Sequence, residues 1–241
     1  MSLITLTLVL TFLVAVRYLL IAGVFYLLFY FLKIERLQKL KIEKANPKLK
    51  IIKREIYWSL GTSIIFGFLG AVVFKAWQNG QTLIYFNESR YGWVYLFCSI
   101  GVAMFIHDSY FYWMHRIVHH PKLFPLIHRV HHDSNPPTPW AAFSFHWSES
   151  ILEALIFPVL VFVLPLHIGA VLFMLVFMTI TSVINHLGYE TYPKWLRESK
   201  IGKYFISATH HQTHHSEFNS NYGLYFNYWD RWMKTQSKKS Y

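Results

Sequence analysis

The stretch HDSYFYWMHRIVHH, residues 107–120, joins an apolar segment to a group of closely spaced histidines. The segment before it, residues 91–106, carries no Asp, Glu, Lys or Arg and is long enough to approach a membrane crossing as a helix. Further along, HRVHH (128–132) and HHQTHH (210–215) also stand outside the longest apolar runs. This alternation of apolar runs and histidine groups defines both the expected fold and the expected site.

The composition is that of a multispan membrane protein. Of the 241 residues 54% are hydrophobic, 19% are aromatic and only 15% are charged, and the mean hydropathy is +0.28. Soluble globular domains carry more charge and less apolar surface. The length fits one domain and no change of composition marks a linker, so a single domain is expected over residues 1–241.

The net charge of +11 is concentrated in one loop. Nine of the 23 Lys and Arg lie between residues 33 and 54, directly after an apolar run. A basic segment in this position is typical of a cytoplasmic loop at a membrane surface, and it gives no reason to expect a nucleic-acid partner. The one cysteine, Cys98, excludes an internal disulfide.

Four apolar segments predict the spans. The first has no basic residues ahead of it and is too long for a signal-peptide core, so we expect it to remain as an anchor. Prolines break the last segment into two short helices that meet near PLHIG (165–169), as a hairpin that either crosses the membrane or re-enters it. The predicted segments are residues 3–32, 56–74, 91–106 and the hairpin 151–184.

The order of these segments predicts the topology. If the basic loop 33–54 is cytoplasmic, the third span returns to the cytoplasmic side near residue 107, and the hairpin brings the chain back to the face it left. Residues 107–150 and 185–241 then share that face. The expected fold is therefore all-α, an integral-membrane helical bundle with a cytoplasmic-facing, histidine-rich helical cap.

The histidine spacing indicates metal binding. His115 and His119 are four residues apart and share one face of a helix, and the pattern H-x-x-H-H occurs twice, at 128–132 and at 211–215, each placing three rings on one flank. Core packing gives no reason to repeat this pattern, and neutral imidazole is a natural metal ligand. With His186, the candidate ligands are His115, His119, His128, His131, His132, His186, His211, His214 and His215. Nine nitrogens exceed the needs of one ion, so two ions are expected.

The ligand type narrows the metal and its chemistry. Imidazole suits zinc, iron, copper and nickel, but structural zinc sites usually include cysteines, and the single cysteine here, Cys98, lies within an apolar run away from the histidine blocks. Two neighbouring redox ions instead indicate oxygen chemistry. No flavin, nicotinamide or haem fingerprint is present, so a separate electron-donor protein is expected, with the basic face as its docking surface.

Four motifs resemble the fatty acid hydroxylase superfamily, the membrane sterol desaturase and hydroxylase group. They lie between residues 100 and 235 and read HDSYFYWMHRIVHH, HRVHHDSNPPTPW, NHLGYE and HHQTHHSEFNSNYGLYFNYWDRWMKT. The resemblance implies a di-iron centre in a cytoplasmic cap, above a bundle through which a lipid reaches the metals. Zinc is an expected substitute for iron in purified protein. Carried over by motif, the eight histidines of the three blocks are ligands and His186 completes the set.

The chain departs from the family pattern at two positions. Some relatives have a further histidine four residues after the one that matches His186, where this chain has Glu190. Glu190 is expected to accept a hydrogen bond from a ligand, to bind metal through water, or to act as a charge at a helix end. In the WDR segment, Lys234 precedes Thr235 where the family often has glycine, which affects the local turn.

Other polar residues adjoin the predicted ligands. Asp108 lies seven residues before His115, on the same helical face, and is expected to bond to a ligand ring or to act as a helix-end charge. The remaining candidates either orient a ligand or pack structurally, and they are His107, His146, His210 and Asn219.

These observations favour an oxygen-dependent lipid C–H hydroxylase, a non-haem di-iron membrane enzyme with dioxygen as co-substrate. The alternative is a lipid or sterol desaturase with the same centre, because loss of a second hydrogen gives a double bond. A metal transporter is less favoured, because nearly all the histidines lie outside the apolar runs, and a lipid-binding protein with a vestigial site is a third alternative. The sequence selects neither the lipid nor the membrane, endoplasmic reticulum or bacterial inner membrane.

Overall fold

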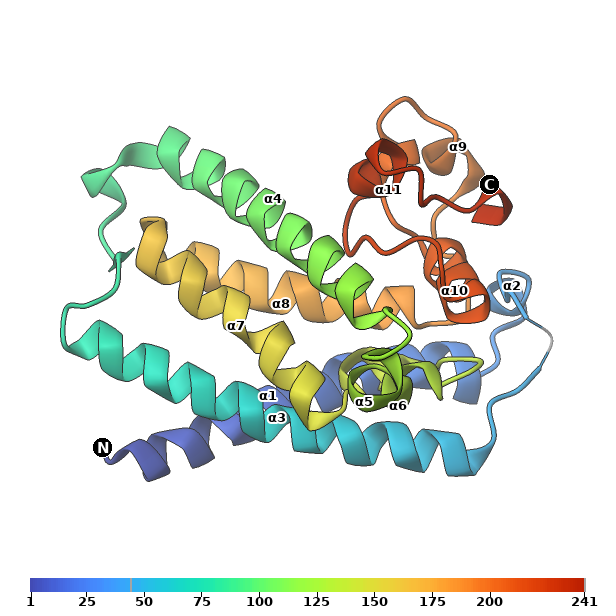
Figure 1. Ribbon diagram of the computed structural model, residues 1–241, viewed down its shortest axis with the longest axis horizontal. Helices are drawn as coiled ribbons and strands as arrows, with labels where there is room; N and C mark the ends of the chain where they lie inside the picture. The colour runs from blue at the N-terminus through green and yellow to red at the C-terminus, as the bar shows by residue number, and fades with distance from the viewer. Residues whose placement is uncertain (44, 241) are drawn as a thin grey trace.

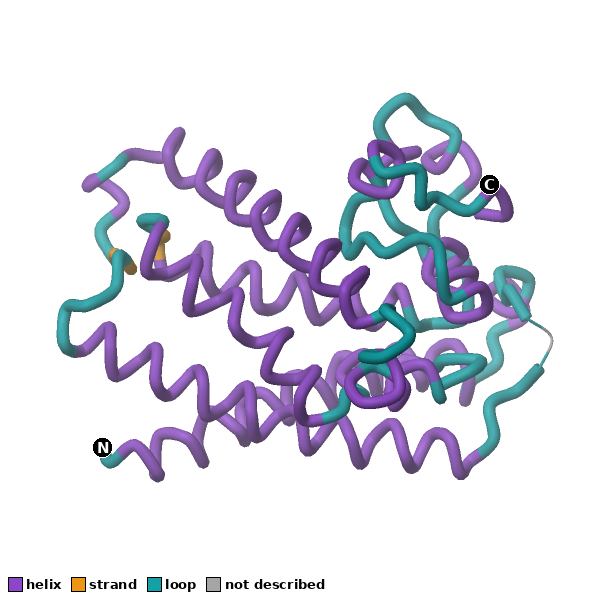
Figure 2. The backbone as a smooth tube through the Cα atoms, viewed as in Figure 1, coloured by secondary structure: helices purple, strands orange, loops and turns teal. Residues whose placement is uncertain are grey.

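The computed structural model describes residues 1–43 and 45–240 and is predominantly helical, with loops joining the helices (Figures 1 and 2). Five long helices form the bundle. α1 is extended by a π-helical turn at Leu27–Phe31, and the five helices are α1 (Leu3–Tyr26), α3 (Leu49–Gln78), α4 (Gly92–Val118), α7 (Trp147–Val163) and α8 (Ile168–Asn185). The predicted all-α membrane bundle is confirmed.

Most of the short elements gather at one end of the bundle, which we call the cap (Figure 1). The short helices are α2 (Glu35–Gln38), α5 (Phe124–Ile127), α6 (Arg129–His132), α9 (Lys194–Arg197), α10 (Ala208–Glu217) and α11 (Tyr228–Trp232). Single 3₁₀ turns occupy Glu88–Arg90, Pro139–Phe143, Gly202–Tyr204 and Lys238–Ser240. At the opposite end, β1 (Ile84–Tyr85) pairs in parallel with β2 (Leu166–His167).

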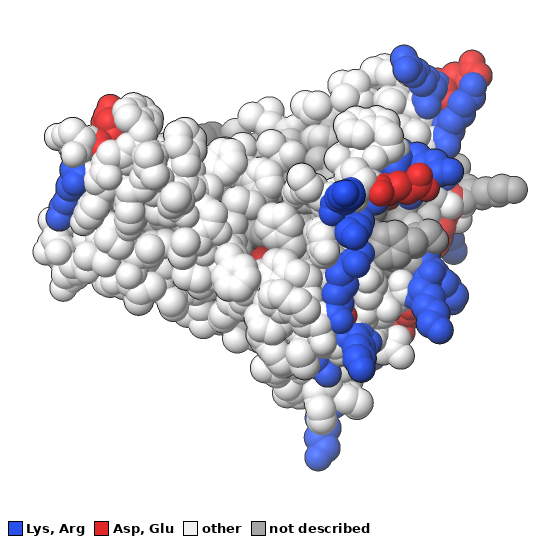
Figure 3. Space-filling model, turned by 90° about the horizontal axis from the view of Figure 1, so that it is seen from above, with Lys and Arg blue, Asp and Glu red and all other residues white. Residues whose placement is uncertain are grey.

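The bundle has the surface of a membrane protein. Among the described residues, four helices are long and apolar enough to cross a membrane: α1 with its π turn, α3, α4 and α8. Large apolar side chains such as Phe12 and Leu20 point outward, 66% and 64% exposed, as expected of a surface that lipid covers. Lys and Arg gather at the cap end, while the middle of the molecule is almost free of them (Figure 3).

The helix that contains the predicted third span is longer than that span. α4 continues without a break from Gly92 to Val118, beyond the predicted 91–106, and so carries His115 on the same helix as the apolar segment. Asp108 is tolerated inside this helix because its carboxylate accepts hydrogen bonds from backbone N–H groups of the segment 224–226. The sequence showed the charge but not the distant amides that satisfy it. α3 also extends beyond the predicted 56–74 at both ends.

The hairpin forms as predicted and returns the chain to the cap. α7 and α8 are antiparallel and meet next to Pro165, while Pro158 is accommodated inside α7 (Figure 1). α8 therefore ends at the same end of the bundle as α4. The two histidine-bearing parts of the chain, which are far apart in sequence, come together there.

α1 and α3 pack closely against each other and hold the 3₁₀ turn Pro139–Phe143 next to the histidines. Gly67 of α3 faces Thr11 of α1 so closely that a Cβ at position 67 would clash with it, an approach that only glycine allows. Nearer the cap, the hydroxyls of Tyr18 and Ser59 both donate to the carbonyl of Trp140, over 2.8 and 3.0 Å. These bonds attach both helices to the 3₁₀ turn beneath the histidines.

Candidate metal centre

Nine histidines converge in the cap as two groups. In each group every residue offers one ligand atom, and these atoms all lie within 4.8 Å of one another. All the rings are buried except that of His119, which is partly buried. The five-histidine group contains His115, His119, His128, His132 and His214, and the four-histidine group contains His131, His186, His211 and His215.

The H-x-x-H-H spacing divides each histidine block between the two groups. In the block at α6, the residues four apart, His128 and His132, join the five-histidine group, while His131 joins the other. In α10 the assignment is reversed, because His211 and His215 join the four-histidine group and His214 joins the five-histidine group. The common flank of each block therefore faces the boundary between the two groups.

The two groups adjoin each other directly. The ring of His132 stacks on that of His215 with centroids 4.5 Å apart, and His128 stacks on His131 at 5.2 Å. Each stacked pair takes one ring from each group. Ions held by the two groups would thus be close neighbours.

Backbone carbonyls fix the protonation of several rings. Nδ1–H of His115 donates to the carbonyl of Tyr222 at 2.9 Å, and Nδ1–H of His214 donates to that of Ser220 at 2.6 Å. His186 makes the same bond to Ser182 at 2.7 Å. A carbonyl can only accept, so Nδ1 carries the proton and Nε2 of the neutral ring presents a bare lone pair. These lone pairs point into the groups.

Inside the groups the Nε2 atoms face one another at short range. The nearest pairs are His115–His128 at 3.0 Å, His214–His132 at 3.1 Å and His186–His211 at 2.8 Å. In the His115–His128 pair both Nδ1 atoms are already engaged, so two bare acceptors face each other, which is unfavourable unless a cation lies between them. An ion bonded to imidazole at about 2.1 Å places two ligands at right angles about 3.0 Å apart, in agreement with these spacings.

Protons are poor candidates for that cation. Burial, which removes water from the charged form, lowers the pKa of His186 and His214 to about 4. Burial and the neighbouring imidazoles hold the pKa of His132 and His211 well below the usual value. The rings are therefore neutral at pH 7. Clustered neutral imidazoles with inward lone pairs fit a pair of metal ions.

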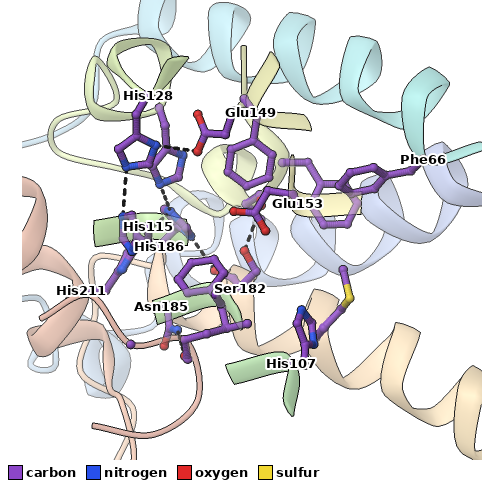
Figure 4. A pocket seen from close by; sticks show the side chains of 18 residues that line it. Phe66, His107, His115, His128, Glu149, Glu153, Ser182, Asn185, His186 and His211 are labelled. Atoms are coloured by element: carbon purple, nitrogen blue, oxygen red, sulfur yellow. Dashed lines mark hydrogen bonds and ion pairs between the residues drawn. The ribbon is translucent and has the colours of Figure 1, made fainter. Parts of the chain in front are cut away.

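Glu149 is a contributor that the sequence did not reveal. Its Oε1 lies 2.6 Å from Nδ1 of His128, and both side chains are buried (Figure 4). A carboxylate in this position fixes the ring's orientation and makes its inward nitrogen a stronger ligand. The available signal was a pair of acids four apart, Glu149 and Glu153, at the start of an otherwise uncharged helix.

The two predicted acidic partners have other roles. Asp108 makes no hydrogen bond to a histidine ring in the described part of the chain, and its Oδ1 instead accepts from the backbone N–H groups of Leu224 and Tyr225. Glu190 accepts hydrogen bonds from Ser207 Oγ at 2.7 Å and from the backbone N–H of Thr209 at 3.3 Å. These bonds at the start of α10 fit the charge at a helix end, one of the three roles expected for Glu190.

The remaining candidates lie around the groups without joining them. His107 borders the histidine-lined cavity, with Nδ1 3.0 Å from the hydroxyl of Tyr225. His146 immediately precedes α7. His210 forms a capping box with Ser207 at the N-terminus of α10. Asn219 is exposed in the turn that follows α10.

Two neighbouring cavities lie between the histidines and the interior of the bundle. A small one of about 40 Å³ is lined by members of both groups (Figure 4). A larger one of about 540 Å³ lies among α1, α3, α7 and α8 and has a mostly apolar lining. Phe66, Glu153 and Met178 border both cavities. An apolar molecule in the larger cavity would have the histidine site at its inner end.

A helical membrane bundle that carries two adjoining histidine groups suited to metal ions defines the class of this protein. Residues 100–235 match the fatty acid hydroxylase family, and the chain belongs to that family. No solved structure matches the chain significantly. The family resemblance seen in the histidine motifs is thus confirmed.

Similar proteins include sterol-modifying enzymes. The Delta(7)-sterol 5(6)-desaturase ERG3B of Gibberella zeae is 34% identical over 182 residues, 74% of this chain and 55% of that protein. Lathosterol oxidase of Mus musculus is 35% identical over 140 residues (58% and 45%), and that of Homo sapiens is 30% identical over 182 residues (75% and 59%). The chain spans about half the length of these relatives.

Removing two ligands from one group should release one metal ion. We expect His211→Ala/His215→Ala to lower the content from about two to about one transition-metal ion per chain, because two of four nitrogens are lost. His128→Ala/His132→Ala should do the same for the other group. Elemental analysis of protein purified with its native metal measures the content. His120→Ala, at an exposed histidine beside the site, is the control, and equal loss in all three variants would contradict the two-group assignment.

Removing the partner of His128 should weaken metal binding without removing a ligand. We expect Glu149→Ala to lower the affinity of the five-histidine group about 10–100-fold, and Glu149→Gln to lower it less because the amide oxygen still accepts. Competition with a chelator measures the affinity. Glu153→Ala, one helical turn later, is the matched control because Glu153 makes no hydrogen bond to a histidine. Equal effects at both positions would argue against the orienting role.

Proposed function

We propose that this protein is an oxygen-dependent oxidase of membrane lipids that forms a carbon–carbon double bond. The observation that carries the proposal is the position of the paired histidine groups at the inner end of an apolar cavity. Sequence analysis ranked hydroxylation first and desaturation second. The relatives named as sterol desaturases and lathosterol oxidases support desaturation better.

The nine histidines would hold two iron ions, with zinc as a substitute in purified protein. Bound iron would supply the chemistry in which dioxygen, two electrons and two protons, together with two hydrogens removed from the lipid, yield two waters. The electrons would come from a separate donor protein. No protein acid or base beyond the ligands is required.

The chain's own contribution is positioning. The carbonyls of Tyr222, Ser220 and Ser182 lock three of the rings, and Glu149 locks a fourth. The apolar lining of the larger cavity would hold the lipid and exclude water, so that one C–H group remains near the histidines. Selection among C–H bonds would thus follow from geometry.

The cap would face the cytoplasm. Most Lys and Arg gather at this end of the molecule (Figure 3), which is the arrangement of the positive-inside rule. The same basic surface would receive the electron donor. The host membrane would be the endoplasmic reticulum or a bacterial inner membrane.

Lipid analysis tests the activity. Cells that express the protein should gain, only in oxygen, a lipid lighter by two hydrogens, and His211→Ala/His215→Ala should abolish the product because the four-histidine group is broken. Mass spectrometry of extracted lipids from both strains measures the change. A gain of one oxygen atom would instead establish hydroxylation, and no oxygen-dependent product from any lipid would refute the proposal.

Topology mapping tests the orientation. Single cysteines placed in the exposed segments at Lys39 and Lys238, in a background with Cys98 replaced, should react from the same, cytoplasmic side. A cysteine at Glu88, near the opposite end, should react only from the other side. Labelling with a membrane-impermeant maleimide in intact and opened cells measures accessibility. Reaction of Lys39 and Lys238 variants from opposite sides would overturn the arrangement.

A further inference from the structure

The larger cavity contains two ionisable side chains within an otherwise mostly apolar lining, Arg17 of α1 and Glu153 of α7. They are placed differently. Arg17 borders only the larger cavity, whereas Glu153 also borders the small cavity lined by the histidines. The polar group closest to the reaction site along this path is therefore Glu153. Figure 4 shows its side chain beside that cavity.

Glu153 has no partner within the protein. In the described part of the chain it makes no hydrogen bond or ion pair, although its helix neighbour Glu149 is bonded to His128. Glu153 is only partly buried and borders both cavities. A carboxyl group at an apolar cavity with no partner is unfavourable unless something polar occupies the space beside it. A polar group of a bound ligand would fill this role.

We propose that Glu153 binds the hydroxyl group of a neutral lipid substrate, an inference that rests on the proposed function. This bond places the hydroxyl-bearing end of the lipid at the passage between the cavities and the apolar remainder in the larger one. The carbon that reacts is consequently only a few bonds from the hydroxyl. A rigid hydroxylated lipid such as a sterol fits this requirement and a cavity of about 540 Å³.

The position of the charges favours a hydroxyl over an anionic group. A carboxyl group exchanges a hydrogen bond with a hydroxyl, as acceptor or as donor, but offers no positive charge to a lipid carboxylate or phosphate. An anionic lipid would instead seek Arg17, which lies away from the histidine-lined cavity. Glu153 is thus a positioning residue that selects both the substrate class and the orientation.

Binding measurements test the inference directly. The probes are a Δ7-sterol with a free 3-hydroxyl and its 3-deoxy analogue, and the protein is the metal-loaded full chain in detergent. We expect wild type to bind the hydroxylated probe up to about tenfold more tightly than the deoxy probe, as for one net hydrogen bond. In Glu153→Ala the preference should fall to about one, and Glu153→Gln should restore part of it.

A matched control separates this role from a general change of the cavity. Val171→Ala also alters the lining of the larger cavity but leaves the carboxyl group, so it should weaken both probes equally and keep the preference. Metal content should remain at the wild-type level in every variant.

Three results would overturn the inference: equal binding of the two probes by wild type, no binding of either, or an unchanged preference in Glu153→Ala. Tighter binding of oleate than of the sterol, lost in Arg17→Gln, would also overturn it by making Arg17 the polar anchor. Failure of the proposed function is distinguishable, because it would appear as an absence of metal or of oxygen-dependent product while the hydroxyl preference persisted.

Discussion

The arrangement of the cap depends on one electrostatic constraint, that bare imidazole nitrogens face one another at about 3 Å in a site without water. Burial keeps the rings neutral, so protonation offers no relief at pH 7. Only cations with an affinity for neutral imidazole make such a cluster favourable. The convergence of segments from α4, α6, α8 and α10 is therefore best understood as the assembly of a metal site.

The H-x-x-H-H pattern explains how so few residues can build two adjoining sites. In a helix, the histidines at positions i and i+4 of this pattern lie one above the other, and the histidine at i+3 lies slightly to one side of them. The block at α6 contributes two rings to the five-histidine group and one to the four-histidine group. The block in α10 contributes one ring to the five-histidine group and two to the four-histidine group. The stacking of His132 on His215 then makes the boundary between the groups out of the ligands themselves. Proximity of the two ions is thus a consequence of spacing within each block.

Much of this could be predicted from the sequence because it depends on local periodicity. Apolar run lengths gave the helices, the prolines gave the turn of the hairpin, and histidine spacing with the family resemblance gave the nine converging residues. The errors concern carboxyl groups, whose partners are distant in sequence. Oδ1 of Asp108 accepts from amides more than a hundred residues away, and Glu149 faces a histidine on another element. No local pattern distinguishes these from ordinary charges at helix ends.

The two acids of α7 connect metal geometry with substrate geometry. Glu149 and Glu153 are one helical turn apart, so their separation is fixed by the helix itself. One holds a ring of the five-histidine group, and the other holds the polar end of the lipid. A displacement of α7 would move both carboxyl groups together, so the proposed hydroxyl site would keep its spacing from the carboxylate that orients His128. In an oxidase of the proposed kind, this spacing would help to decide which C–H bond reacts.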